Sequence, residues 1–317
     1  MKRSIFCLRP EEAVALVFLL PTTWLTVAAN LYAREAGVMG ARHPGGMVRL
    51  GAAVALGTFL ALLLRYRPQA PFTQGLRDCL PFLLCVLIYT NLHDTIGFVN
   101  PHDVHDQLAA LDRALFGVSP TQWAERFITT PRTEWMQFFY ANFFWLAPSV
   151  SLILLARRRF SEFRATTLAV LACFFLGYAL YVIFPAAPPR LTLVREYAKN
   201  LYGYPQFFSR LNAEAFSLLP VDSRAAFPSL HTAVSVVMLV CAWRHVRAWF
   251  WFTLPFVVGL WVSTIYLRHH YAVDLLAGFA LAPLALFVAP RFDLSWTRRQ
   301  RALGIAPARG APEDRGS

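Results

Sequence analysis

Long apolar stretches recur along this chain, and they constrain its fold more than any other feature of the sequence. An α-helix needs roughly 20 such residues to cross the hydrocarbon core of a bilayer. Apolar and aromatic residues make up 57% of the chain, and the mean hydropathy is +0.45. We therefore predict an all-α polytopic membrane bundle of about eight transmembrane helices. The predicted spans are 13–32, 47–65, 78–97, 134–156, 165–184, 228–243, 249–267 and 271–290.

Positive charge follows this topology. The formal net charge of +12 would suit a nucleic-acid-binding protein, but the basic residues fall in alternate connections between spans. This distribution is the one that the positive-inside rule predicts when both termini are cytoplasmic. We expect attraction to anionic membrane lipids and no nucleic acid partner. The residues concerned are Lys2, Arg3 and Arg9; Arg65, Arg67 and Arg77; Arg157, Arg158, Arg159 and Arg164; Arg244 and Arg247; and Arg291, Arg298, Arg299 and Arg301.

The first apolar stretch shares features with a signal peptide, including Lys2, Arg3 and the small residues at 26–29. Its length and the spans that follow favour an uncleaved helix. Arginine and alanine predominate over lysine, which favours a bacterial chain and hence the inner (plasma) membrane. The five cysteines form no C-x-x-C pair, so we expect small buried residues rather than disulfides or a zinc site.

Two long connections, 98–133 and 185–227, lie on the extracytoplasmic side in this topology, as does the short turn 268–270. Apolar residues recur at helical spacing over 106–117, which predicts an amphipathic surface helix ended by Gly117. We expect interfacial turns and a short helix in 185–227. The same side of the membrane then receives Arg190, His231 and His270, although they are far apart in the sequence.

Polar residues with catalytic potential gather at the ends of two of these spans. His270 and Asp274 are four residues apart and share one helix face. The carboxylate can accept a proton from one ring nitrogen, which leaves the other as a nucleophile. A hydrogen-bonded pair that only holds the helix end is the alternative. Phe227-Pro228-Ser229-Leu230-His231 opens another helix, where free amides favour an anion and His231 can protonate a leaving oxygen.

Phosphoryl transfer needs stabilisation of spread negative charge, and arginine provides it through paired hydrogen bonds. Arg190, Arg224 and Arg268 are near the predicted site by topology, so we take them with Ser229 as candidate phosphate-binding residues. Each arginine could instead be an interfacial anchor facing lipid head groups. A second polar group, His93-Asp94 with His102-Asp103-Val104-His105-Asp106, is more typical of loop and cap residues or an acceptor pocket than of metal ligands.

These motifs resemble those of the type-2 phosphatidic acid phosphatase (PAP2) superfamily, whose usual patterns are K-x6-R-P, P-S-G-H and S-R-x5-H-x3-D. The spacing from Ser263 to His270 to Asp274 matches the third pattern. The inositol phosphorylceramide synthase branch is more similar, since its motifs read F-P-S-L-H and Y-L-x-H-H-Y-x-x-D. These correspond to 227–231 and 266–274.

The resemblance covers about 80–290. It implies a six-helix PAP2-like catalytic domain, which we place at 76–292. The two N-terminal helices that we expect in 1–75 lie outside the resemblance, and the composition of the C-terminal tail, 293–317, predicts a cytoplasmic, disordered segment. His270 would attack phosphorus and carry the covalent group, and Asp274 would orient it. His231 would protonate the leaving group and then activate the acceptor, while Arg190 would hold phosphate oxygens. No cofactor and no metal are implied for this step.

Three departures from the wider superfamily concern the phosphate ligands. Leu230 replaces the glycine of the second motif, and Thr264 replaces the arginine of the third. Ile183 stands where the first motif has lysine. Arg268 is our candidate to compensate for the missing arginine.

The predicted function is transfer of a phosphoryl or phospho-head-group, for example phosphoinositol, from a lipid to an alcohol such as a sphingolipid-like acceptor. Hydrolysis of a lipid or polyprenyl phosphate by water is the first alternative. A non-catalytic phospholipid-binding or transport protein is the second, and it predicts polar residues at mid-membrane depth instead of helix ends. The sequence leaves the donor, the acceptor and the oligomeric state open.

Overall fold

The computed structural model describes residues 5–35, 70–201, 207–217 and 224–313, together with 51, 54, 55, 57–59, 62 and 66. Regular structure in this part is helical, apart from one isolated bridge between Ala186 and Ala225. The prediction of an all-α polytopic fold is confirmed. Among the described residues, the helical segments long and apolar enough to cross a membrane are Pro10–Ala28, Phe72–Tyr89, Thr130–Ala156, Phe160–Ile183, Arg247–Tyr266 and Ala272–Ala302.

The other two predicted spans have different outcomes. Most of 47–65 lies outside the described residues. The span predicted at 228–243 coincides with helix α11, Leu230–His245, which has 16 residues. Such a helix is about 24 Å long, shorter than the hydrocarbon core that the longer helices can cross.

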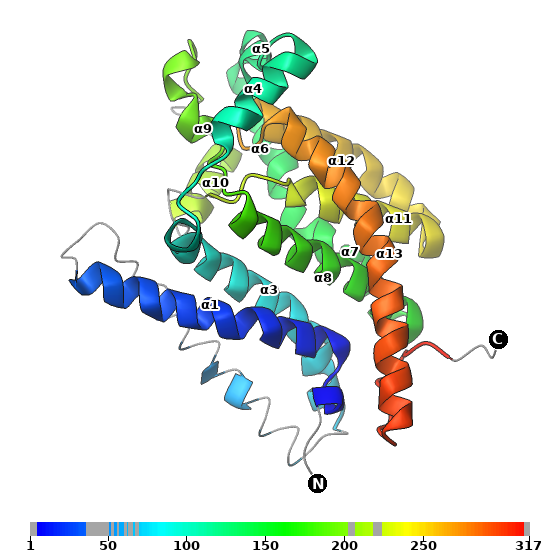
Figure 1. The fold of residues 1–317 in the computed structure, drawn as a ribbon. Helices are drawn as coiled ribbons and strands as arrows, with labels where there is room; N and C mark the ends of the chain where they lie inside the picture. Colours follow the sequence, from blue (N-terminus) through cyan, green and yellow to red (C-terminus); the bar gives the residue numbers. More distant parts are fainter. Residues whose placement is uncertain are drawn as a thin grey trace. The chain divides into compact units, whose positions relative to one another are not determined.

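The chain forms two compact units, residues 1–101 and 102–317. In the first unit, helix α1 (Pro10–Glu35) packs against helix α3 (Pro71–Val99) (Figure 1). The Arg9 guanidinium donates a 2.6 Å hydrogen bond to Asp78, and Arg77 pairs with Glu12. These ion pairs join α3 to the start of α1.

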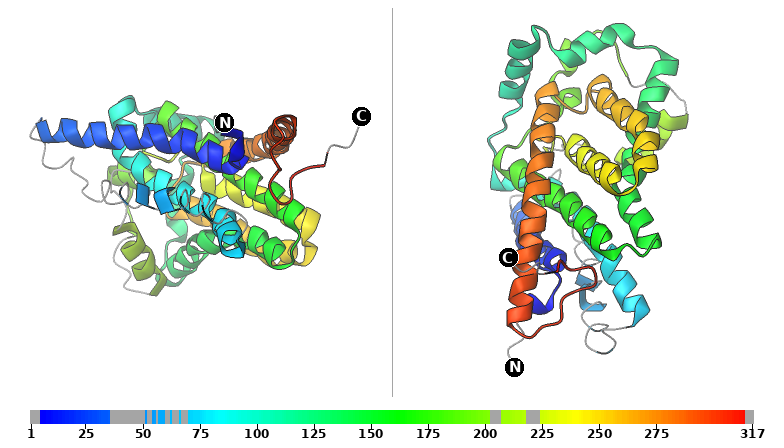
Figure 2. Two further views of the ribbon diagram at one scale, coloured as in Figure 1. Left: turned by 90° about the horizontal axis from the view of Figure 1, so that it is seen from below. Right: turned by 90° about the vertical axis from the view of Figure 1, so that its right-hand side faces the viewer.

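The second unit is a bundle built around α11. Its other long helices are α6 (Thr130–Ala141), α7 (Phe143–Ala156), α8 (Phe160–Ile183), α12 (Arg247–Tyr266) and α13 (Ala272–Ala302). Helix α11 packs against α7, α8, α12 and α13, and its buried residues surround the helix (Figure 2). A helix that is apolar on all sides belongs in the centre of a bundle.

Helix α13 extends further than the sequence predicts. Residues 293–302 are helical rather than part of a disordered tail, and Asp293 is buried against α8. The Arg164 guanidinium donates hydrogen bonds of 2.7 to 3.1 Å to both carboxylate oxygens of Asp293. Beyond the helix, the Arg309 guanidinium lies 3.6 Å from the ring centroid of Phe160. These contacts order the chain well past the predicted end of the catalytic domain.

Short helices gather at the end of the second unit where α12 finishes and α13 begins (Figures 1 and 2). We call residues 102–127 and 186–217, as far as they are described, the cap. Its helix α4, His105–Phe116, confirms the predicted amphipathic helix, which ends at Gly117 with a left-handed φ of 72°. The predicted turns and short helix of 185–227 comprise α9 (Pro189–Thr192), a 3-10 turn (Val194–Glu196) and α10 (Phe207–Ser217).

Candidate active site

The turn between α12 and α13 carries His270. The backbone amides of His269 and His270 both donate to the Thr264 carbonyl, at 2.8 and 3.2 Å, which folds the turn back on the end of α12. At the start of α13, the Asp274 carboxylate accepts a 2.8 Å hydrogen bond from the Tyr271 amide. The carboxylate therefore caps its own helix and is held one turn from the imidazole of His270.

Three side chains predicted to be catalytic form one continuous chain. His270 Nδ1 lies 3.2 Å from Asp274 Oδ2, and His270 Nε2 lies 3.1 Å from His231 Nδ1. A carboxylate accepts the Nδ1 proton, so Nε2 keeps its lone pair and His231 Nδ1 is the donor in the second contact. The structure thus brings together residues 39 positions apart in an arrangement that leaves Nε2 as the nucleophilic atom.

Backbone contacts hold the first turn of α11 against α13. The Ser229 amide donates a 2.9 Å hydrogen bond to the Asp274 carbonyl, so the two motifs are joined directly. Ser229 Oγ accepts a 3.3 Å hydrogen bond from the Thr232 amide and caps α11. A Cβ on Gly278 would lie 2.5 Å from the Ser229 carbonyl oxygen. Glycine at this position therefore permits the close approach that sets the separation of His231 and His270.

The environment of His270 favours the neutral imidazole. The His270 residue is only 4% exposed. Burial is the main cause that lowers the pKa of His270 to about 4; a hydrogen bond to the Ala226 backbone opposes this shift, and the positive charge of Arg190 adds to it. An imidazole with this pKa has an available lone pair at neutral pH, as a nucleophile requires.

Aromatic side chains that the sequence analysis did not single out line the histidines. The Tyr140 ring stacks on His269 with centroids 4.3 Å apart and lies 5.0 Å from His231. The Phe143 ring is 4.5 Å from His231. Tyr140 and Phe143 lie in an apolar helical segment with no motif of their own, so no local signal distinguishes them from bundle core.

The candidate phosphate-binding arginines have different surroundings. Arg190 opens α9, and its amide donates a 2.9 Å hydrogen bond to the Arg268 carbonyl. Burial is the larger cause that lowers the pKa of both His269 and His270, and the positive charge of Arg190 lowers it further. The Arg224 guanidinium lies 3.5 Å from the Asp103 carboxylate.

Arg268 contacts the cap. Its guanidinium donates hydrogen bonds of 2.8 Å to Glu125 and 2.7 Å to the Lys199 carbonyl, and it lies 3.6 Å from the Tyr197 ring centroid. The backbone of Arg268 is left-handed, with φ of 62°. These contacts offset the cost of that conformation. They hold the turn against the cap, and the phosphate contact that the sequence suggested for Arg268 stays a prediction.

The structure accommodates two departures from the superfamily pattern. Leu230 packs where Gly177 of α8 has no side chain, since a Cβ there would lie 2.5 Å from Leu230 Cδ2. Thr264 is fully buried, and its hydroxyl donates to the Trp261 carbonyl at 2.8 Å.

The second polar group of the sequence, at 93–94 and 102–106, has members in both compact units of the chain. His93 and Asp94 lie in α3, but their side chains are outside the described part of the structure. His105 contacts Asp103 and Asp106, each at 3.8 Å. In the described residues, no group of three or more histidine, cysteine, aspartate or glutamate side chains is placed to hold a metal ion.

Comparisons with known proteins find relatives among enzymes of lipid synthesis. A phosphoinositol dihydroceramide synthase of Bacteroides thetaiotaomicron is 28% identical over 65% of this chain and 73% of its own length. An inositol phosphorylceramide synthase of Candida albicans is 34% identical over 35% of this chain, and the catalytic subunit of the Saccharomyces cerevisiae synthase is 32% identical over 33%. The matched regions are 26% and 29% of those two fungal proteins. No solved structure matches the chain.

The family comparison covers the catalytic motifs. The sequence pattern of the PAP2 superfamily matches residues 106–288, which is more than half of the chain and includes His231, His270 and Asp274. The match starts within α4 and ends within α13, so the cap from residue 106 onward lies in the matched region. The chain is an integral membrane enzyme that acts on phosphorylated lipids, and it belongs to the PAP2 superfamily.

Proposed function

We propose that this protein transfers a phospho-head-group, such as phosphoinositol, from a lipid donor to an alcohol acceptor through a covalent intermediate on His270. The observation that carries the proposal is the contact chain from His231 through His270 to Asp274, with links of 3.1 and 3.2 Å. It supplies a nucleophile, a carboxylate that orients it, and an acid and base within reach of the same phosphorus.

In the first step, the lone pair of His270 Nε2 attacks the donor phosphorus and forms an N–P bond. The P–O bond to the lipid alcohol breaks, and a protonated His231 transfers its proton to the leaving oxygen. A phosphorus atom bonded to Nε2 takes the place of the 3.1 Å contact, so His231 then faces an oxygen on phosphorus. Asp274 stabilises the positive charge that develops on the His270 ring.

In the second step, neutral His231 removes the proton from the acceptor hydroxyl. The acceptor oxygen forms a bond to phosphorus as the N–P bond to His270 breaks, which restores both imidazoles to their starting states. Arg190 contributes positive charge to the phosphoryl oxygens in both steps; its effect on the pKa of His270 supports a position near them. Ser229 and Arg224 are further proposed phosphate-binding residues, and the N-terminus of α11 adds its amides.

Transfer to an alcohol is favoured over hydrolysis by the relatives. The Bacteroides and Candida proteins are named as synthases of phosphoinositol-containing ceramides, and the first similarity extends over most of that relative. The acceptor proposed here is therefore a sphingolipid-like alcohol. The arrangement of basic residues supports a site on the extracytoplasmic face, and the predominance of arginine and alanine over lysine supports a bacterial inner membrane.

The test uses the purified full-length protein in detergent with labelled phospholipids and prenyl phosphates, each with and without ceramide-like alcohols or inositol. We expect an alcohol-dependent phospholipid product that is absent with His270→Ala. Free phosphate released regardless of the alcohol would replace transfer with hydrolysis. Lack of turnover of every donor by the wild-type protein would argue for a binding protein.

A further inference from the structure

We infer that Asp112, a buried carboxylate on the surface helix α4, is a positioning residue that holds the nucleophile turn in its reactive geometry. This inference rests on the proposed function. Asp112 is 160 residues from the start of α13, and no motif includes it. Its role follows from contacts between the cap and the helix that carries Asp274.

Both carboxylate oxygens of Asp112 are used. Oδ2 accepts a 2.9 Å hydrogen bond from the Ala272 amide, and Oδ1 accepts a 2.9 Å hydrogen bond from the Val273 amide. The residue is 1% exposed. Burial of a carboxylate is unfavourable unless hydrogen bonds compensate for lost hydration. Asp112 is therefore not a solvated surface charge. Its position is determined by these two amides.

The amides belong to the first turn of α13, where helical N–H groups have no partner within the helix. Asp274 satisfies the Tyr271 amide, and Asp112 satisfies the next two. Negative charge at this end also interacts favourably with the helix dipole. Two carboxylates from distant segments thus fix three successive amides directly after His270. The orientation of this turn determines the direction of the His270 ring.

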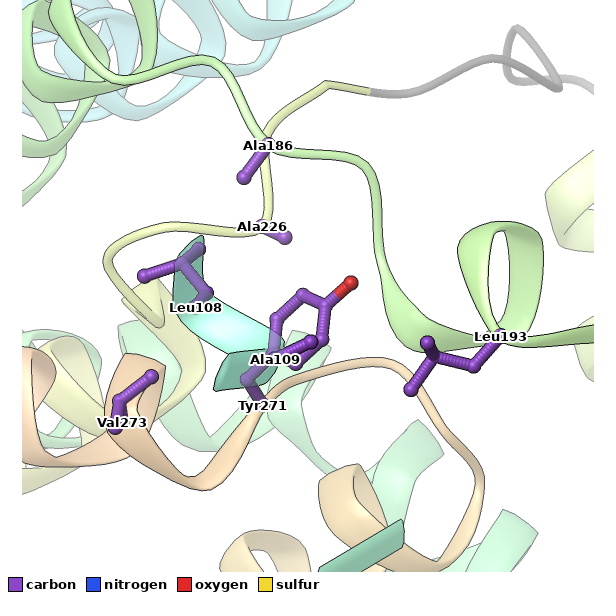
Figure 3. Close-up of a cluster of buried hydrophobic side chains, with 7 residues drawn as sticks. All are labelled: Leu108, Ala109, Ala186, Leu193, Ala226, Tyr271 and Val273. Atoms are coloured by element: carbon purple, nitrogen blue, oxygen red, sulfur yellow. The ribbon is translucent and has the colours of Figure 1, made fainter. Parts of the chain in front are cut away.

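Packing on the same face of α4 supports this contact. Leu108 and Ala109 precede Asp112 by four and three residues, and they pack in a buried cluster with Tyr271 and Val273 (Figure 3). The Tyr271 hydroxyl lies 2.7 Å from the Thr192 hydroxyl of α9. The apolar cluster holds α4 against the turn but gives no direction to the backbone amides. Asp112 provides that direction, because its hydrogen bonds require a particular orientation.

The experiment measures kcat and KM of full-length variants with the donor that the wild-type protein turns over. We expect Asp112→Ala to lower kcat by about a hundredfold, the effect of a displacement near 1 Å, while KM changes less than about threefold. Asp112→Asn retains one acceptor oxygen and should lose less. Gln107→Ala is the matched control, because this exposed polar residue lies on the same helix, and it should retain wild-type kcat. Equal kcat for Asp112→Ala and the control would overturn the inference.

Ala272→Pro tests the same contact from the other side. Proline is tolerated at the first position of a helix and lacks the N–H that Asp112 accepts. Tyr271, the preceding residue, has φ of −70° and ψ of 155°, which suits a residue before proline. Asp112→Ala combined with Ala272→Pro should lower kcat no further than Asp112→Ala alone. Multiplied losses would show that the two residues act independently and would contradict the inference.

Hydrogen exchange at the amides of 271–274 separates this inference from the proposed function, because it needs no substrate. Asp112→Ala should accelerate this exchange, and Gln107→Ala should leave it unchanged. If the wild-type protein turns over no donor, the proposed function fails while exchange still decides whether Asp112 holds the turn. Unchanged exchange in folded Asp112→Ala would refute the positioning role.

Discussion

Gly278→Ala is the substitution that most sharply tests how the catalytic histidines are held. Gly278 lies one turn beyond Asp274 in α13, where the backbone of α11 approaches closely. The added Cβ would be 2.5 Å from the Ser229 carbonyl oxygen and 2.8 Å from Thr232 Cβ. Neither neighbour can rotate away as the end of a long side chain could. The first turn of α11 must therefore move.

The size of this movement follows from ordinary contact distances. Relief of a 2.5 Å contact to about 3.5 Å moves the start of α11 by about 1 Å. His231 would then lie about 4 Å from His270 Nε2, beyond hydrogen-bonding distance. A displacement of about 1 Å lowers kcat about a hundredfold, which corresponds to roughly 2.7 kcal/mol of transition-state stabilisation. Crowding of this kind also lowers the free energy of unfolding by about 1 to 3 kcal/mol.

The assay compares kcat per folded molecule for the wild-type protein, Gly278→Ala and Gly75→Ala. Gly75 is a helical glycine with no atom within 4 Å of the added Cβ, so its variant controls for the change in helix propensity. We expect the control to keep wild-type kcat. Folded Gly278→Ala with more than half of wild-type kcat would refute the claim that this close approach sets the histidine separation.

Three further predictions concern other contacts in the catalytic unit. Gly177→Ala places a Cβ 2.5 Å from Leu230, so we expect kcat to fall about tenfold and Leu230→Ala in the same chain to restore it; lack of rescue would contradict a direct clash. Arg164→Ala leaves Asp293 buried without its bidentate partner and should lower the free energy of unfolding by about 3 to 5 kcal/mol. A loss below about 1 kcal/mol in a denaturant titration would contradict this prediction. The pKa of His270 is lowered from 6.5 to about 4 in the folded protein, so between these pH values the unfolded chain binds one proton more. The free energy of unfolding should therefore decline by about 3 kcal/mol as the pH falls from about 6.5 to 4. His270→Gln should lose this part of the pH dependence, and an identical pH dependence in both proteins would count against the shift.

Local patterns predicted much of this molecule. Hydropathy located the long helices, and Gly117 marked the end of α4 because a left-handed residue commonly ends a helix. Motif spacing selected His231, His270 and Asp274, which the structure brings into one hydrogen-bonded chain. These features depend on residues close together in sequence or on patterns with strict spacing.

Contacts between distant segments were not predictable in this way. Arg268 was expected near phosphate, but its charge is paired with Glu125, which is 143 residues earlier. Asp112 looks like an ordinary polar residue of an amphipathic helix until the amides of α13 are placed beside it. Helical residues 293–302 continue past the predicted domain end, and Asp293 among them pairs with Arg164 of α8. A single sequence does not specify such pairs, since each depends on packing of the whole unit.

The central claim is that His270 is the residue that carries the transferred group. The measurement is to quench the wild-type protein during turnover of a phosphorus-labelled donor, digest it, and locate the label by mass spectrometry. We predict label on the peptide that contains His270, stable in base and released in acid as an N–P bond requires, and absent from His270→Ala. Turnover by His270→Ala, or label on a different residue of the wild-type protein, would contradict the account.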